Sequence, residues 1–122
     1  MEEKGFVTKR VAELLRLKGF DGNTNHYYAD GEDGLLRSLS TINWNDVVGY
    51  YSAPTVQAAI DWVETKDYWI VDCPLNYYNG IDVSVLALDE KKVWDVVKNF
   101  VTPTKYEALN KALEYCLENL IR

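Results

Sequence analysis

The sequence feature that most constrains the fold is the stretch from Tyr50 to Val63, in which an extended run passes directly into a helix. Pro54 disfavours helical backbone angles at the residue before it, so the chain is held extended up to Ala53. The hydroxyl oxygen of Thr55 can then accept a hydrogen bond from a free amide of the first helical turn. The stretch therefore predicts a strand that ends before Pro54 and a helix that begins after Thr55.

The helix predicted after Thr55 carries one apolar stripe. Its apolar side chains recur at positions i, i+3, i+4 and i+7, namely Val56, Ala59, Ile60 and Val63. This spacing places the four side chains on one face of a helix. The helix must bury that face against another layer of the protein.

A second Pro-Thr junction, Pro103-Thr104, lies near the end of the sequence. Glu107 follows Thr104 by three residues, which is the spacing of a capping box. Three strand-like runs precede each junction, so the sequence predicts a tandem β-β-β-α pseudo-repeat after an N-terminal helix. Convergent capping chemistry is the alternative, because few other residues match between the two copies.

The remaining elements follow from turn signals and hydrophobic periodicity. Thr8 is the predicted N-cap of the first helix, and Gly19 the residue that ends it. Asn79-Gly80 predicts a tight hairpin turn. The last helix is predicted over 105–120, with Asn110 on its exposed side and Cys116 on its buried side. Strands are predicted at 26–29, 35–40, 47–52, 67–72, 81–87 and 93–97.

Two of these strands have alternatives, because a helical turn also fits 35–40 and a helix also fits 93–97. Taken together, the elements predict a single α+β domain over residues 1–122. We expect a mostly antiparallel sheet of five or six strands, with two or three helices packed on one face.

The composition restricts the classes of partner. The net charge is −6 and the sequence pI is near 4.7, which disfavours nucleic acid and anionic membranes, since both bind clustered Lys and Arg. No apolar run is long enough to span a bilayer, and the first residues do not resemble a signal peptide. We expect a soluble cytoplasmic protein in which Cys73 and Cys116 stay reduced.

Catalytic and cofactor motifs are absent from the sequence. It contains no P-loop, no G-x-S-x-G, no G-x-G-x-x-G, no C-x-x-C and no H-E-x-x-H, so no cofactor is predicted. An alternative function is a small ligand-binding or hydrolytic enzyme domain that uses His26, Asp72 and Asp82. That alternative requires the fold to bring these three residues into one polar pocket.

One pattern resembles a calcium-binding loop. Asp21, Asn23, Asn25 and Glu32 stand at the spacing of positions 1, 3, 5 and 12 of an EF-hand loop, where oxygen atoms surround the ion. Position 6 of such a loop requires glycine, and His26 occupies it here. Residues of these types also collect in turns without binding a metal.

Paired aromatic residues are the strongest indication of a binding surface. Adjacent strand residues face opposite sides of a sheet, so each pair should place one ring on each face. If helices cover only one face, the rings on the other face are available to a protein partner. The candidate residues are Tyr50, Tyr51, Tyr68, Trp69, Tyr77 and Tyr78.

Several short motifs in the chain occur together, namely Leu17-Lys18-Gly19-Phe20, Tyr50-x-x-Ala53-Pro54-Thr55 with Gln57-Ala58 and Trp62-Val63, and Trp69-Ile70-Val71. They are similar to motifs of a family of small proteins carried by Bacteroidetes genomes, prophages and mobile elements. The family usually shows Thr-Tyr-x-x-Ala before its last helix, whereas Tyr106 stands one residue later here. The resemblance implies a phage or mobile-element context and no known activity. We therefore expect a non-enzymatic protein-interaction module.

Overall fold

The computed structural model of the chain describes residues 5–73 and 81–121. These residues form three α-helices and six strands, joined by a 3-10 turn and a π-helical turn. In chain order the elements are α1 (Lys9–Leu17), β1 (Thr24–Ala29), β2 (Leu36–Ile42), the 3-10 turn η1 (Trp44–Asp46), β3 (Tyr50–Ser52), α2 (Val56–Glu64), β4 (Tyr68–Cys73), β5 (Ile81–Leu88), β6 (Trp94–Thr102), α3 (Lys105–Tyr115) and the π turn η2 (Cys116–Leu120).

The six strands form two separate three-stranded sheets. One sheet has the order β2-β1-β3 and the other has the order β4-β5-β6, and every pair of neighbouring strands is antiparallel. The predicted α+β class and antiparallel pairing are confirmed. The prediction of one continuous sheet is wrong, because β3 and β4 belong to different sheets and α2 connects them.

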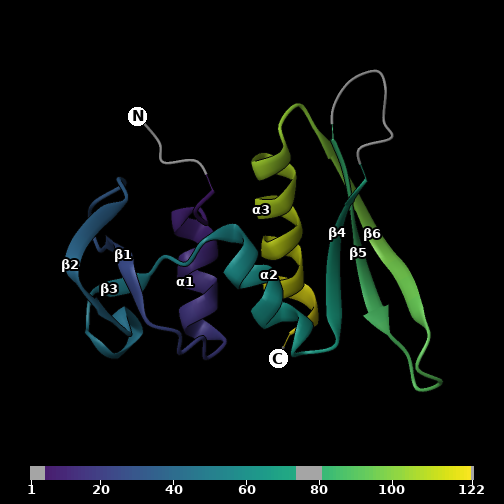
Figure 1. The fold of residues 1–122 in the computed structure, drawn as a ribbon, viewed down its shortest axis with the longest axis horizontal. Helices are drawn as coiled ribbons and strands as arrows, with labels where there is room; N and C mark the ends of the chain where they lie inside the picture. Colours follow the sequence, from purple (N-terminus) through teal and green to yellow (C-terminus); the bar gives the residue numbers. More distant parts are fainter. Residues whose placement is uncertain (1–4, 74–80, 122) are drawn as a thin grey trace.

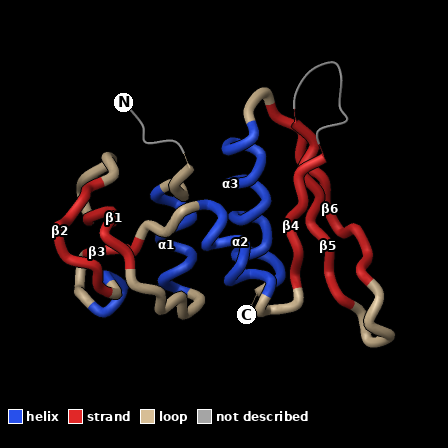
Figure 2. Tube along the Cα trace, in the orientation of Figure 1, coloured by secondary structure: helices blue, strands red, loops and turns tan. Residues whose placement is uncertain are grey.

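The three helices form a layer between the two sheets (Figure 1). Coloured by element type, Figure 2 shows strands at both ends of the molecule and helices in the middle. The core contains the apolar faces of all three helices, and Ile70, Val83 and Val85 extend it onto the second sheet. Each sheet therefore has an inner face toward the helices and an outer face directed away from them.

The tandem pseudo-repeat holds for the order of the elements but not for the pairing of the strands. Three strands, a Pro-Thr junction and a helix do occur twice. In the first sheet the central strand is the first of the three, β1, whereas in the second sheet it is the middle one, β5. The two halves are therefore not copies of one structural unit, and shared capping chemistry explains the similarity of the two junctions.

The predicted helix caps are present. The hydroxyl oxygens of Thr8, Thr55 and Thr104 accept hydrogen bonds from backbone amides three residues later, at 3.3, 3.1 and 3.4 Å. Gly19 has a φ of +92°, and the amide of Phe20 donates to the carbonyl of Leu15 at 2.9 Å, as in a Schellman motif. Local signals therefore fix where these helices begin and where α1 ends.

Several boundaries differ from the prediction. The third strand begins only at Tyr50, because residues 47–49 form a turn in which Gly49 has a φ of +86° and the amide of Tyr50 donates to the carbonyl of Val47 at 3.2 Å. Residues 94–97 are in a strand, as predicted, and not in the alternative helix. The strand continues to Thr102. Phe6 forms a β-bridge with Thr55. The predicted Asn79-Gly80 turn lies outside the described residues.

The last helix ends in the π turn, where the amide of Ile121 donates to the carbonyl of Cys116 at 2.8 Å. Cys116 is fully buried, and burial raises the pKa of its thiol to about 12. The thiol is therefore neutral at physiological pH, and Cys116 forms no disulfide. Asn110, which the periodicity places on the exposed side of this helix, is instead buried.

Candidate functional site

The pair Tyr68-Trp69 places one ring on each face of the second sheet, as predicted. Tyr68 packs against the core, and its hydroxyl donates to the carbonyl of Leu120 at 3.3 Å. Trp69 faces the other way, and 42% of its surface is exposed. Only Trp69 of this pair is available to a partner.

The pair Tyr50-Tyr51 is divided in the same way, but both rings are held by neighbours. Tyr51 packs against the core, and its hydroxyl donates to Asp30 at 2.6 Å, which raises the pKa of Tyr51. On the other face, the ring of Tyr50 meets Tyr27 edge-on at 5.3 Å and Trp44 at 5.8 Å. These rings therefore contribute to the packing of the first sheet. Tyr77 and Tyr78 lie outside the described residues.

The outer face of the second sheet carries a group of apolar side chains that we call the outer cluster. Its first row crosses all three strands, with Leu86 of β5 paired to Trp69 of β4 on one side and to Val96 of β6 on the other. Its second row pairs Leu88 with Trp94. The two indole rings approach to 5.7 Å between centroids. The outer cluster is thus Trp69, Leu86, Leu88, Trp94 and Val96.

The outer cluster is open to solvent. Val96 is 59% exposed, and no helix or strand within 5–73 and 81–121 covers this face of the sheet. A polar row bounds the cluster on one side, where the hydroxyl of Ser84 donates to the side-chain oxygen of Asn99 at 3.3 Å. Val101 lies beyond that row on the same face. Of the five side chains, Trp69 and Val96 are exposed, and Leu86, Leu88 and Trp94 are half-buried. An apolar patch of this kind is a candidate interaction surface.

The free edge of β6 beside the outer cluster is irregular. Val85 pairs with Lys98 and Leu86 pairs with Val96, so Val97 is the additional residue of a β-bulge. A bulge interrupts the row of hydrogen-bonding groups that an edge strand presents. It is one of the features by which proteins prevent another chain from adding to an exposed edge.

The residues of the calcium-binding interpretation do not lie in one continuous loop. Asn25 lies within β1, and its side-chain oxygen is 2.9 Å from the Nδ1 atom of His26. The extended backbone from Asn25 to Ala29 covers about 13 Å, and Glu32 follows after a further turn, so most of β1 lies between Asn25 and Glu32. In the described part of the chain, no group of three or more His, Cys, Asp or Glu residues is placed to hold a metal.

The three candidate residues of the enzyme alternative do not come together. His26 is a buried residue of β1 in the first sheet, and its ring lies 4.1 Å from that of Phe6. Asp72 belongs to β4, and its carboxylate is 3.9 Å from the Nζ atom of Lys105. Asp82 lies on the outer face of the second sheet, opposite Cys73. The polar pocket that this alternative requires is not formed by these residues.

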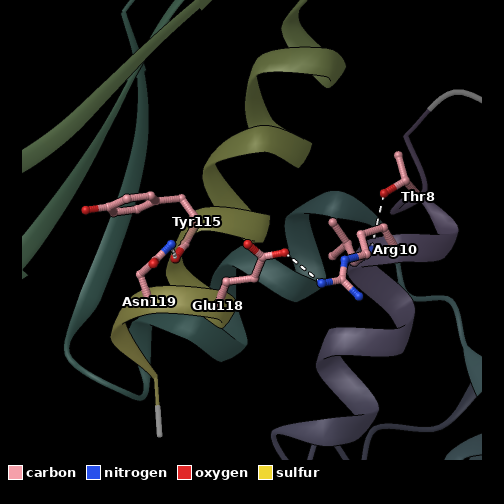
Figure 3. Close-up of polar contacts among 6 residues, drawn as sticks. Thr8, Arg10, Tyr115, Glu118 and Asn119 are labelled. Carbon is pink, nitrogen blue, oxygen red and sulfur yellow. Dashed lines mark hydrogen bonds and ion pairs between the residues drawn. The ribbon is translucent and has the colours of Figure 1, made fainter.

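Arg10 and Glu118 form an ion pair in which Nη2 and Oε1 are 2.9 Å apart (Figure 3). Each of these two residues lines one of two shallow grooves. The larger groove, of about 450 Å³, contains residues of α1 and Tyr51. The smaller one, of about 200 Å³, lies between Phe100 and the end of α3. Neither groove includes a residue of the outer cluster or of the enzyme alternative.

Four of the five residues of the outer cluster are absent from the candidates drawn from the sequence. Leu86 and Leu88 alternate with the buried Val85 and lie on the face of β5 that also carries Asp82 and Ser84. Trp94 and Val96 are also two residues apart, like Leu86 and Leu88, within the predicted strand 93–97. The apolar residues of the outer cluster are therefore visible in the sequence as alternation within each strand. That they share one surface follows only from the pairing of the strands.

None of the described helices is long and apolar enough to cross a membrane. Comparisons with protein-family models, with curated proteins and with solved structures found no match to this chain.

Proposed function

We propose that this chain is a non-enzymatic protein-interaction module that binds its partner through the outer cluster. One observation carries the proposal: Trp69, Leu86 and Val96 form an uninterrupted apolar row across a sheet face that no described element covers. Tryptophan is among the residues that contribute most to binding energy at protein interfaces. The row is the surface of the described chain best suited to a protein partner.

The charge of the chain supports a basic partner. A net charge of −6 attracts positively charged surfaces over several ångströms and accelerates their association. The same charge disfavours nucleic acid as the partner. The resemblance to prophage and mobile-element proteins supports a cytoplasmic setting, in which the module binds a host or phage protein.

The proposal is tested by placing a charge in the outer cluster. Tagged Val96→Lys protein and native protein are used to capture partners from a lysate of the organism that carries the gene. We expect Val96→Lys to lower the amount of the specifically enriched partner by about tenfold or more, since a charge must then be desolvated at the interface.

Val101→Lys is the matched control. Val101 lies on the same strand and face as Val96 and is exposed to a similar extent, 54% against 59%, but it is outside the outer cluster. This variant should capture the partner as the native protein does. Equal capture by all three proteins, or equal loss in both variants with unchanged thermal unfolding, would remove the outer cluster as the binding surface.

A further inference from the structure

Three Asp-Gly pairs lie close to the first two strands, and each can undergo a chemical change that needs no enzyme. The pairs are Asp21-Gly22, Asp30-Gly31 and Asp33-Gly34. In such a pair the glycine amide can attack the side-chain carboxyl group before it and close a cyclic imide. Glycine favours this step because it has no Cβ atom to obstruct the approach. Which pair reacts in the folded protein depends on how firmly the fold holds each one.

The first two pairs are held by their neighbours. A Cβ atom on Gly22 would lie 2.6 Å from the buried ring of Phe20, so the Gly22 backbone is tightly packed. The carboxylate of Asp30 accepts the hydrogen bond from the Tyr51 hydroxyl at 2.6 Å. The amide of Asp30 also donates to the carbonyl of Gly49 at 2.9 Å. Each pair must therefore break native contacts before its imide can close.

The third pair has none of these restraints. Asp33 and Gly34 are both exposed, in the loop between β1 and β2. Among the hydrogen bonds of residues 5–73 and 81–121, none involves the Asp33 carboxylate or the Gly34 amide. A Cβ atom on Gly34 would meet nothing within 4 Å. The two reacting groups of this pair are therefore free to approach each other while the protein stays folded.

We propose that Asp33 is a site of spontaneous modification, at which the folded protein converts aspartate to isoaspartate. The Gly34 nitrogen bonds to the Cγ atom of Asp33 in its acid form, and the carboxyl hydroxyl leaves with the amide proton as water. Water then adds to the resulting imide. Where it breaks the bond from the main-chain carbonyl carbon of Asp33 to the Gly34 nitrogen, the chain continues through Cγ and a free α-carboxylate remains. Opening on the other side restores aspartate.

The modification changes the loop that joins the strands of the first sheet. Isoaspartate adds one carbon atom to the main chain, close to the point where Leu36 pairs with Tyr27. The neighbouring carbonyl of Glu32 accepts a hydrogen bond from the Nζ atom of Lys9 at 2.6 Å, which ties the loop to α1. A longer main chain displaces these contacts, so the isomerised protein has a less stable first sheet.

The proposal is tested by incubating the folded protein in oxygen-18 water at mildly acidic pH, where the acid form of the carboxyl group is populated. Opening of the imide adds one oxygen-18 atom, and fragmentation in the mass spectrometer locates both the label and isoaspartate. We expect Asp33 to be labelled several-fold faster than Asp21 or Asp30. Gly34→Ala should slow the labelling of Asp33 several-fold without changing thermal unfolding, since the φ of Gly34 is not left-handed and the space around it is open.

Two comparisons establish whether the fold selects the site. Tyr51→Phe removes the hydrogen bond to Asp30 and should accelerate labelling at Asp30 but not at Asp33. In urea, where the fold is lost, all three pairs should react at similar rates. Equal labelling of the three pairs in the folded protein, or the same preference for Asp33 in urea, would overturn the proposal. Unchanged labelling of Asp30 in Tyr51→Phe would overturn the protective role of the hydroxyl.

Discussion

Asn110 joins two elements of the core that are far apart in sequence. Its side-chain oxygen accepts a hydrogen bond from the amide of Thr8 at 2.9 Å, and its side-chain nitrogen donates to the carbonyl of Tyr106 at 2.9 Å. Thr8 is the N-cap of α1, so this buried amide group ties the start of α1 to α3. Each of these two hydrogen bonds pairs the Asn110 side chain with a backbone group, the amide of Thr8 in one and the carbonyl of Tyr106 in the other.

We expect Asn110→Ala to lower the free energy of unfolding by about 2 kcal/mol, because the amide of Thr8 would lose its partner inside the protein. Urea denaturation monitored by circular dichroism measures the change.

Asn119→Ala is the control, since Asn119 also donates to the carbonyl four residues before it, at 3.2 Å, but is exposed. It should change the stability by less than about 0.5 kcal/mol. Equal effects of the two variants would show that the bond to Thr8 contributes nothing.

At the scale of residues, the sequence predicts what depends on near neighbours. The three threonine caps and Gly19 were located correctly, because each acts on backbone groups within a few positions. Asn110 was misplaced because its partner, Thr8, is 102 positions away. The two aromatic pairs that the structure describes, Tyr50-Tyr51 and Tyr68-Trp69, are split between faces as predicted. Which rings stay open depends on residues such as Trp44, which no local pattern identifies.

Among the elements, β6 combines a long free edge with an irregular register. The strand pairs only with β5 among the described strands, and Val97 is 41% exposed at its bulge. A regular edge with valines at this density would present a continuous row of unpaired amides and carbonyls to a second copy. The bulge opposes that association.

Deletion of Val97 should restore a regular edge, and we expect the variant to self-associate as its concentration rises. Size-exclusion chromatography with light scattering, over a range of concentrations, measures this association.

The same deletion combined with Val96→Lys should remove this self-association, since a lysine on the strand disfavours edge pairing. If the deletion variant has the same concentration dependence of its molar mass as the native protein, the bulge has no protective role.

Element types were predicted better than their partners. Strand 93–97 was correctly preferred over a helix from its Val and Trp content, yet nothing in that run indicates the bulge. The single predicted sheet became two because strand pairing is a contact between distant segments, and alternation alone does not say which strands are neighbours. The outer cluster was missed for the same reason, since it exists only when β4, β5 and β6 are side by side.

Over the whole molecule, the two sheets are packed unequally. Most residues of β2 are exposed and the strand pairs only with β1, whereas β5 is paired on both sides and contributes two fully buried valines. Regions with few buried apolar contacts open at lower free energy than the core. The first sheet is thus the weaker end of the molecule.

Hydrogen exchange should therefore be faster in β2 than in β5, and we expect the protection of β2 amides to be lower by about tenfold or more. Exchange resolved to peptides by mass spectrometry measures the difference. Equal protection of the two strands would mean that both sheets open only when the entire core unfolds.

The helix layer also separates the outer faces of the two sheets. The rings of Tyr27, Trp44 and Tyr50 lie on the outer face of the first sheet, and the outer cluster lies on the outer face of the second. Because the helices lie between the sheets, the two outer faces are at opposite ends of the molecule (Figure 1). Substitutions at sites this far apart have additive effects on stability. During evolution, substitutions on one outer face can therefore accumulate without changing what substitutions on the other face cost in stability.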